Sequence, residues 1–129
     1  MGLTKVTALL TDLNGKMPGF EALFTVDGTT IHCIAPASVL KAAGIIPHWK
    51  MVYKMDNGTL SEVDYGYAIV SFLGNETVVH IIFGAEGTEP ILGISALENV
   101  GIGIDPATNS LKRMPAVSLK RLQVAGAKK

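Results

Sequence analysis

The sequence predicts a mainly β protein, and three observations carry that prediction. Short segments rich in β-branched and apolar residues dominate the chain. Turn-forming stretches such as NGKMPG, DG, DNG and GAEGTEP separate these segments. Only two segments have the composition of short helices. We therefore expect strands over residues 5–11, 21–26, 29–34, 49–55, 68–73 and 77–83.

The first two strands lead to the first question about function. Residues 5–11 are unusually apolar for a surface strand, so they form either a core strand or an edge that pairs with another chain. After the second strand, Asp27 and Gly28 stand between apolar β residues. An Asp-Gly pair in that setting is a strong signal for a two-residue hairpin turn, because both positions tolerate positive φ. From these residues alone, a plain hairpin is the favoured interpretation of Asp27.

Two short helices interrupt the β pattern. Residues 36–43 begin with proline and have good helix formers up to Gly44. Residues 95–101 begin at Ser95, with Glu98 placed three positions later as in a capping box. Each segment ends at a glycine, which predicts a helix that stops there.

The two helical segments also resemble each other. The stretches VLKAAGI (39–45) and ALENVGI (96–102) share leucine, glycine and isoleucine at the same relative positions. Each stretch follows a β segment that ends in a small loop. The chain therefore suggests two copies of a strand, loop and helix unit, with a hairpin inserted between them.

That inserted hairpin has its turn at residues 56–58, Asp-Asn-Gly, between arms at 50–55 and 60–72. Its arms are partly polar, as in an ordinary surface hairpin. The same hairpin also fits a mobile flap over a cleft. The strand after it, residues 77–83, is apolar enough to be a core strand.

Size and charge limit the classes of function. A chain of 129 residues predicts one domain, 1–129, with a core over about 5–115 and a basic tail over about 116–129. Eleven basic and eleven acidic residues cancel, and the pI is near 6.8. No overall field would attract nucleic acid or an anionic membrane, so neither is expected as a partner.

No segment has the length and apolar character of a membrane span or the pattern of an export signal. The single cysteine, Cys33, cannot form an internal disulfide, which favours a reducing, cytoplasmic location.

The three histidines His32, His48 and His80 lack the spacing of metal ligands. His32 and Cys33 are neighbours on a strand and point to opposite faces. We therefore predict no metal and no cofactor.

Four pieces of the sequence occur in a recognisable order. An aspartate follows an apolar strand, a helix begins with proline and closes before Gly-Ile, a hairpin tip reads MDNGTL, and the run EPILGISALENVGIGIDP comes last. This order resembles the retropepsin-like aspartic proteases, in particular their small bacterial and archaeal members. The resemblance covers roughly residues 20–112. It implies a closed, β-barrel-like acid protease fold with one or two short helices.

The resemblance also implies an activity, namely an aspartic endopeptidase that cuts extended, apolar peptide segments. The catalytic pair would be Asp27 from each subunit of a homodimer, since the other aspartates lack a matching loop. The active-site loop would be Gly28, Thr29 and Thr30. The residues expected to pack behind this loop are Ile91, Leu92 and Gly93. The tip of the flap would comprise Met55, Asp56, Asn57, Gly58, Thr59 and Leu60.

One block departs from the family pattern and leaves alternatives open. The family has Asp-Thr-Gly or Asp-Ser-Gly, whereas Asp27 is followed by Gly28, Thr29 and Thr30. Either the order of threonine and glycine is exchanged, or the residue after the aspartate is missing. The altered triplet also fits a catalytically inactive scaffold that binds peptides or dimerises. An unrelated small β domain with a plain hairpin at Asp27 is the third alternative.

Overall fold

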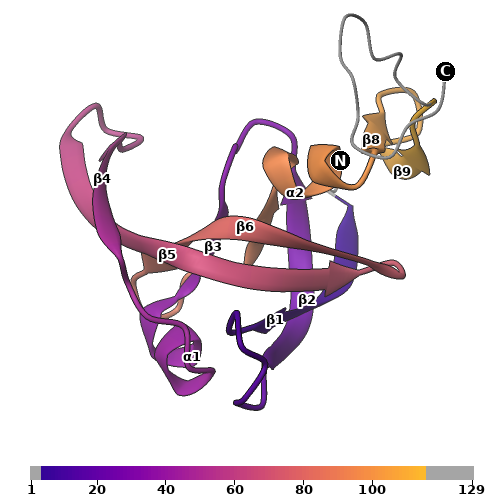
Figure 1. The fold of residues 1–129 in the computed structure, drawn as a ribbon. Helices are drawn as coiled ribbons and strands as arrows, with labels where there is room; N and C mark the ends of the chain where they lie inside the picture. Colours follow the sequence, from indigo (N-terminus) through magenta and orange to yellow (C-terminus); the bar gives the residue numbers. More distant parts are fainter. Residues whose placement is uncertain (1–3, 116–129) are drawn as a thin grey trace, which may run out of the picture.

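The computed structural model describes residues 4–115 and consists mostly of β-strands (Figure 1). The predicted basic tail, 116–129, lies outside the described residues. The strands are β1 (Lys5–Thr11), β2 (Phe20–Asp27), β3 (Cys33–Pro36), β4 (Trp49–Lys54), β5 (Leu60–Phe72), β6 (Asn75–Gly84), β7 (Ile91–Gly93), β8 (Ile102–Asp105) and β9 (Ser110–Arg113). The two helices are α1 (Ala37–Ala42) and α2 (Ile94–Asn99). Neither of these helices is long and apolar enough to cross a membrane.

Six strands close into a ring. The large sheet has the order β1-β2-β7-β3-β6-β5-β4, and β1 pairs with β5 as well as with β2. The long strand β5 makes this closure possible, because its end pairs with β1 while its beginning pairs with β4. Strand β4 lies outside the ring and forms a projecting hairpin with β5 (Figure 1). The predicted closed, barrel-like fold is thus confirmed.

Strand β7 lies between β2 and β3. It runs parallel to β2, where Gly93 is opposite Asp27, and antiparallel to β3, where Ile91 is opposite Ile34. Strands β2 and β3 are therefore not hydrogen-bonded neighbours. The plain-hairpin interpretation of Asp27 is wrong, because the strand that would complete the hairpin pairs with β7 and β6 instead.

The core fills the inside of the ring. Along β1 the buried residues are Val6, Ala8 and Leu10, which alternate with more exposed ones as a strand requires. Because β1 pairs on both sides and buries one face, it is a core strand and not an edge. Along β6, buried residues also predominate from Val79 to Phe83, as predicted.

Both helices are short, and glycines follow their C-terminal ends. The backbone turns at Gly44 and Gly101, with φ of +83° and +75°, as expected for glycines that end helices. Ser95 is not the N-cap that the sequence predicts. The N-cap is Gly93 and helix α2 begins at Ile94, so Ser95 lies in the first turn, where its hydroxyl donates to the carbonyl oxygen of Ile31 at 2.7 Å. This hydrogen bond ties the helix to the segment that follows Asp27.

Candidate active site at the end of strand β2

Asp27 is the last residue of β2 and lies opposite Gly93 of β7. The preceding residue, Val26, is buried in the core, whereas Gly28 and Thr29 are exposed. Asp27 itself is half-buried. Asp27 therefore lies at one end of the ring of strands, at the boundary between the core and solvent.

Both oxygens of the Asp27 carboxylate accept hydrogen bonds from the loop that follows. Thr29 donates to Oδ1 from its hydroxyl at 2.7 Å and from its backbone N–H at 2.9 Å, and the Thr30 hydroxyl donates to Oδ2 at 2.9 Å. These bonds favour the ionised form, with the Thr29 hydroxyl making the largest contribution. The pKa of Asp27 is therefore lower than usual, although partial burial opposes the shift. The loop holds Asp27 as a carboxylate.

The loop between Asp27 and β3 is fixed from behind by β7 and α2. A Cβ atom added to Gly93 would lie 2.5 Å from the carbonyl carbon of His32, so only glycine allows this close approach. The backbone N–H of Ile94 donates to the carbonyl oxygen of Thr30 at 2.8 Å. Of the predicted supporting residues, Leu92 and Gly93 are buried and Ile91 is half-buried.

The predicted flap residues, 55–60, are the exposed tip of the β4–β5 hairpin. The N–H of Met55 donates to the carbonyl oxygen of Thr59, and the N–H of Gly58 donates to the carbonyl oxygen of Met55. The side chain of Asn57 accepts hydrogen bonds from both the N–H and the hydroxyl of Thr59. Hydrogen bonds within the turn therefore hold the tip of the hairpin together.

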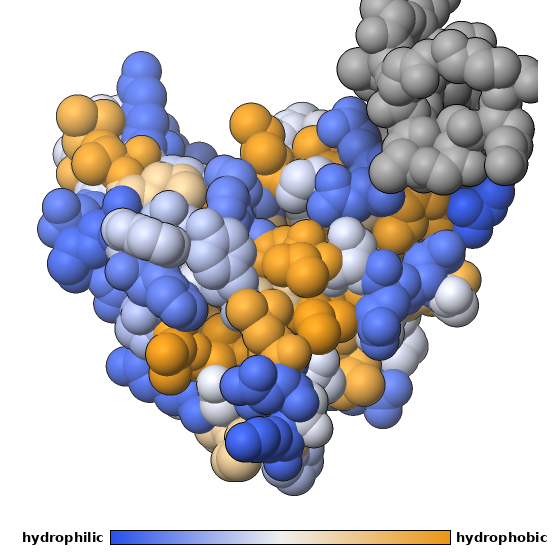
Figure 2. All heavy atoms as spheres, in the orientation of Figure 1, coloured by the Kyte–Doolittle hydropathy of each residue, from blue (hydrophilic) through white to orange (hydrophobic). Residues whose placement is uncertain are grey.

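A cleft of about 470 Å³ separates the Asp27 loop from this hairpin. Figure 2 shows it as a notch between the hairpin tip at the upper left and the part of the molecule that contains α2. One wall of the cleft is formed by residues 29–32 of the loop and by Ile34 of β3. The other wall is formed by Tyr53, Lys54 and Asp56 of the hairpin. Thr29 and Thr30 thus face the cleft and also hold the carboxylate of Asp27.

An aromatic cluster on the outer face of the sheet was missed by the sequence analysis. It contains the three histidines, the three tyrosines and the tryptophan of the chain, which are His32, His48, His80, Tyr53, Tyr65, Tyr67 and Trp49. The three histidines are far apart in the sequence but belong to one cluster in the fold. One sequence signal for this cluster is the spacing of Tyr65 and Tyr67, since residues two positions apart on a strand share a face.

His32 connects this cluster to the loop that follows Asp27. Its ring stacks on Tyr53 of the hairpin, with ring centroids 6.4 Å apart, and lies 5.2 Å from the ring of His80. The pKa of His32 is lowered, first by burial and then by the neighbouring His80. Among the described residues, no group of three or more histidines, cysteines or acidic residues is placed to hold a metal ion.

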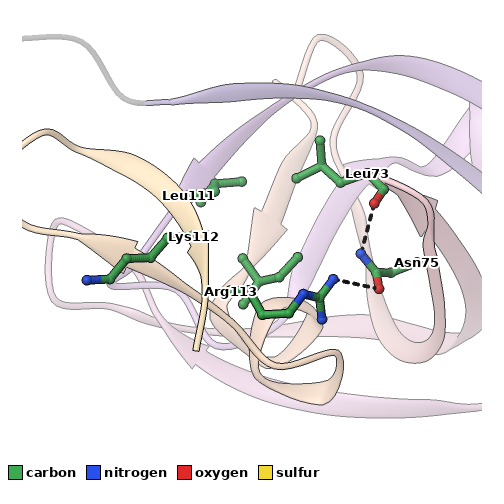
Figure 3. Close-up of a pocket in the computed structure, with 6 residues that line it drawn as sticks. Leu73, Asn75, Leu111, Lys112 and Arg113 are labelled. Carbon is green, nitrogen blue, oxygen red and sulfur yellow. Dashed lines mark hydrogen bonds between the residues drawn. The ribbon is translucent and has the colours of Figure 1, made fainter. Parts of the chain in front are cut away.

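A second hollow, of about 160 Å³, lies between the β5–β6 turn and the β8–β9 hairpin (Figure 3). The guanidinium of Arg113 donates to Val100 O at 2.9 Å and to the side-chain oxygen of Asn75 at 3.2 Å. The Asn75 amide in turn donates to Leu73 O at 2.9 Å. These polar groups join the two hairpins to each other, so the hollow has a structural explanation and is not a second active-site candidate.

Comparisons with known proteins agree with the architecture. No family model matches the sequence, and a search of curated proteins finds no match. Among solved structures, the simian foamy virus (mac) protease matches with a TM-score of 0.53 and 15% identity, over 74% of this chain and 92% of that protein. The retroviral protease-like domain of Ddi1 from Leishmania major matches with a TM-score of 0.50 and 15% identity, over 86% and 89%. The chain therefore has a retropepsin-like fold.

Proposed function

We propose that the chain is an aspartic endopeptidase whose catalytic pair forms from Asp27 of two identical subunits. The observation that carries the proposal is the position of Asp27 at the end of β2, directly beside a loop that lines a peptide-sized cleft under the β4–β5 hairpin. The retropepsin-like fold supports it, since the two solved structures named above are a protease and a protease-like domain. The assignment to the small bacterial and archaeal type is part of the same proposal.

Two copies are needed because one chain supplies one such carboxylate. Within residues 4–115, the hydrogen bonds to the Asp27 side chain come from Thr29 and Thr30, and no second acidic side chain joins them. Peptide hydrolysis by aspartates needs two carboxyl groups that share one proton. A homodimer with its two-fold axis beside Asp27 would bring the second group to the first.

The pair would then supply both an acid and a base. At an effective dielectric constant near 20, two charges about 4 Å apart repel by about 4 kcal/mol, or roughly three pKa units, so one carboxyl keeps its proton while the other is ionised. The ionised carboxylate accepts a proton from the attacking water, and the protonated one donates to the carbonyl oxygen of the peptide. The hairpin tip, residues 55–60, would cover the bound peptide and exclude water.

A second candidate function is a catalytically inactive scaffold that binds peptides or dimerises, and a specific observation favours it. Gly28 has no hydroxyl, and the hydroxyls of Thr29 and Thr30 both donate to Asp27 of their own loop. The hydroxyl that joins the two loops of a retropepsin-like dimer would then be absent. The two candidates differ in chemistry but share the cleft.

The experiment that separates them is a digestion assay with a denatured protein mixture, from acidic to neutral pH, with and without pepstatin. We expect cleavage by the wild type, inhibition by pepstatin and no cleavage by Asp27→Asn. Equal cleavage by both versions, or none by either, removes the enzyme proposal. The size of the protein in solution is measured in parallel, because a strict monomer cannot assemble the pair.

A gain-of-function variant sharpens this test. The variant Gly28→Ser restores a hydroxyl directly after Asp27, and a Cβ there would meet only the flexible Cδ1 end of Ile104, at 3.1 Å. We expect Gly28→Ser to fold and to raise cleavage if the missing hydroxyl limits the wild type. Its matched control is Gly28→Ala, which adds the Cβ without the hydroxyl.

The cytoplasmic location remains a proposal, supported by Cys33 as a buried free thiol.

A further inference from the structure

His32 and His80 are far apart in the sequence but adjacent in the sheet. Strands β3 and β6 are parallel neighbours with Cys33 opposite Ile81, so the residues just before these two come together. Cys33 and Ile81 point into the core, so the preceding histidines lie on the outer face. Their ring centroids are 5.2 Å apart.

One nitrogen of this pair has no partner. Nδ1 of His32 is a buried atom without a hydrogen bond, and it is the one such side-chain nitrogen or oxygen among the described residues. Buried polar atoms in folded proteins are nearly always satisfied, and an ordered water or a bound ion is one explanation for an exception. A water or an ion beside His32 would therefore supply the partner that this nitrogen lacks.

A hollow of about 220 Å³ adjoins both imidazoles. Its other lining residues are Tyr67, Val78, Val79, Ser95 and Asn99. Two of its polar side chains are already paired, since the Ser95 hydroxyl donates to Ile31 O and the Asn99 amide donates to Val78 O. Within residues 4–115 neither imidazole makes such a hydrogen bond, so the two rings remain available to a ligand.

We propose that His32 and His80 form a two-histidine site for a divalent first-row transition metal such as Zn²⁺, with water completing the coordination. The spacing fits. A Zn–N bond of about 2.1 Å puts each ring centre about 3.2 Å from the ion, so a tetrahedral angle separates the two centres by about 5 Å. Imidazole suits zinc, copper and nickel, whereas magnesium and calcium prefer oxygen ligands.

Bound metal would add a side-chain link between β6 and the loop that precedes β3, next to the point where the pairing of these two strands begins. His32 stands at the end of the loop that begins at Asp27, and His80 is in the middle of β6. His32 also lines both the cleft under the hairpin and the smaller hollow. Metal binding should therefore raise the unfolding temperature, because the ion binds the folded arrangement and not the unfolded chain.

The test is a calorimetric titration of the full chain, with any affinity tag removed, using ZnCl2 as the probe and MgCl2 as the negative control. We expect one Zn²⁺ per chain, a higher unfolding temperature with ZnCl2 and no binding of Mg²⁺. His80→Phe keeps an aromatic ring and removes the nitrogen ligands, so it should weaken Zn²⁺ binding at least about tenfold. His48→Phe is the matched control, because the His48 ring contacts Trp49 and Tyr67 but neither His32 nor His80.

Three results overturn the proposal. These are unchanged Zn²⁺ binding by His80→Phe, an equal loss in His48→Phe, and no binding by the folded wild type at millimolar ZnCl2. If His80→Phe fails to fold, NMR of the wild-type histidine side chains decides instead. Paramagnetic NiCl2 should broaden the ring signals of His32 and His80 before those of His48, and the reverse order contradicts the site. None of these measurements requires peptidase activity.

Discussion

Thr29 donates two hydrogen bonds to one carboxylate oxygen of Asp27, from its hydroxyl at 2.7 Å and from its backbone N–H at 2.9 Å. A hydroxyl has one hydrogen, so in this arrangement it has no proton left to donate across a subunit interface. The loop stabilises a charged Asp27 within each single chain. Stability, pKa and any catalytic role of Asp27 are therefore linked through Thr29.

Removing the Thr29 hydroxyl should raise the pKa of Asp27. In Thr29→Val the side chain keeps its shape but loses the donor, so the pKa of Asp27 should move up towards its usual 3.8. At pH 7 the variant should be less stable by about 1 kcal/mol, the value of a charge-assisted hydrogen bond reduced by solvent exposure. NMR titration of the Asp27 carboxyl carbon measures the pKa, and urea unfolding measures the stability.

The stability difference should also depend on pH. Because the pKa of Asp27 is lower in the folded chain than in the unfolded one, its contribution is complete above the usual value of 3.8 and is lost as the pH falls through the folded pKa. Wild type and Thr29→Val should therefore converge in acid. Thr30→Val is the control, since Thr30 makes a single bond to the other oxygen and has the smaller effect on the pKa. A larger shift in Thr30→Val contradicts this account.

Gly93→Ala should destabilise the fold strongly. The added Cβ would lie 2.5 Å from backbone atoms of Ile31 and His32, which cannot move without displacing the Asp27 loop. We expect a loss of about 3 kcal/mol, at the upper end for overpacking, measured by urea unfolding. Gly58→Ala is the matched control at the hairpin tip, where φ is +88° and no atom lies within 4 Å. It should cost only about 1 kcal/mol from backbone strain, so equal losses would refute the steric explanation.

Cys33 should be unreactive in the folded protein. Its side chain is fully buried, and burial raises its pKa to about 11, although the N–H of Gly93 donates to Sγ. At about pH 8 on the order of one thiol in a thousand is then ionised, and the reagent must also wait for the fold to open. Reaction with Ellman's reagent should be slow for the native chain and fast in concentrated urea. A rapid stoichiometric reaction of the native chain would contradict the buried position of Cys33.

The sequence predicts the strands better than it predicts their neighbours. Alternating and apolar patterns locate most of the large sheet, since they depend on residues that are close in sequence. The Asp-Gly signal at Asp27 failed because β7, which comes more than sixty residues later, inserts between β2 and β3. The expected strand 29–34 starts only at Cys33, since the preceding residues form the Asp27 loop.

The candidate site was predicted in part for the same reason. The order of short motifs indicated Asp27, its loop and the hairpin tip, all of which are local features. The contact between His32 and His80 depends on the parallel pairing of β3 with β6, which spacing along the chain does not reveal. The hydroxyl contacts of Thr29 depend on the exact path of the loop, and neither interpretation of the altered triplet, exchanged order or missing residue, specified that path.

The low pKa of Asp27 leads to a prediction for the proposed peptidase activity. The pair is active while it holds one proton, and the higher of its two apparent pKa values sets the upper pH limit. Because Thr29 stabilises the ionised form, that limit should lie in the acidic range, and Thr29→Val should move it to higher pH. The pH dependence of kcat/KM for a peptide substrate measures the limit in both proteins. A limit that stays in place or moves to lower pH would mean that the Thr29 hydroxyl does not act on the pair in the dimer, and that this loop is rebuilt when two chains meet.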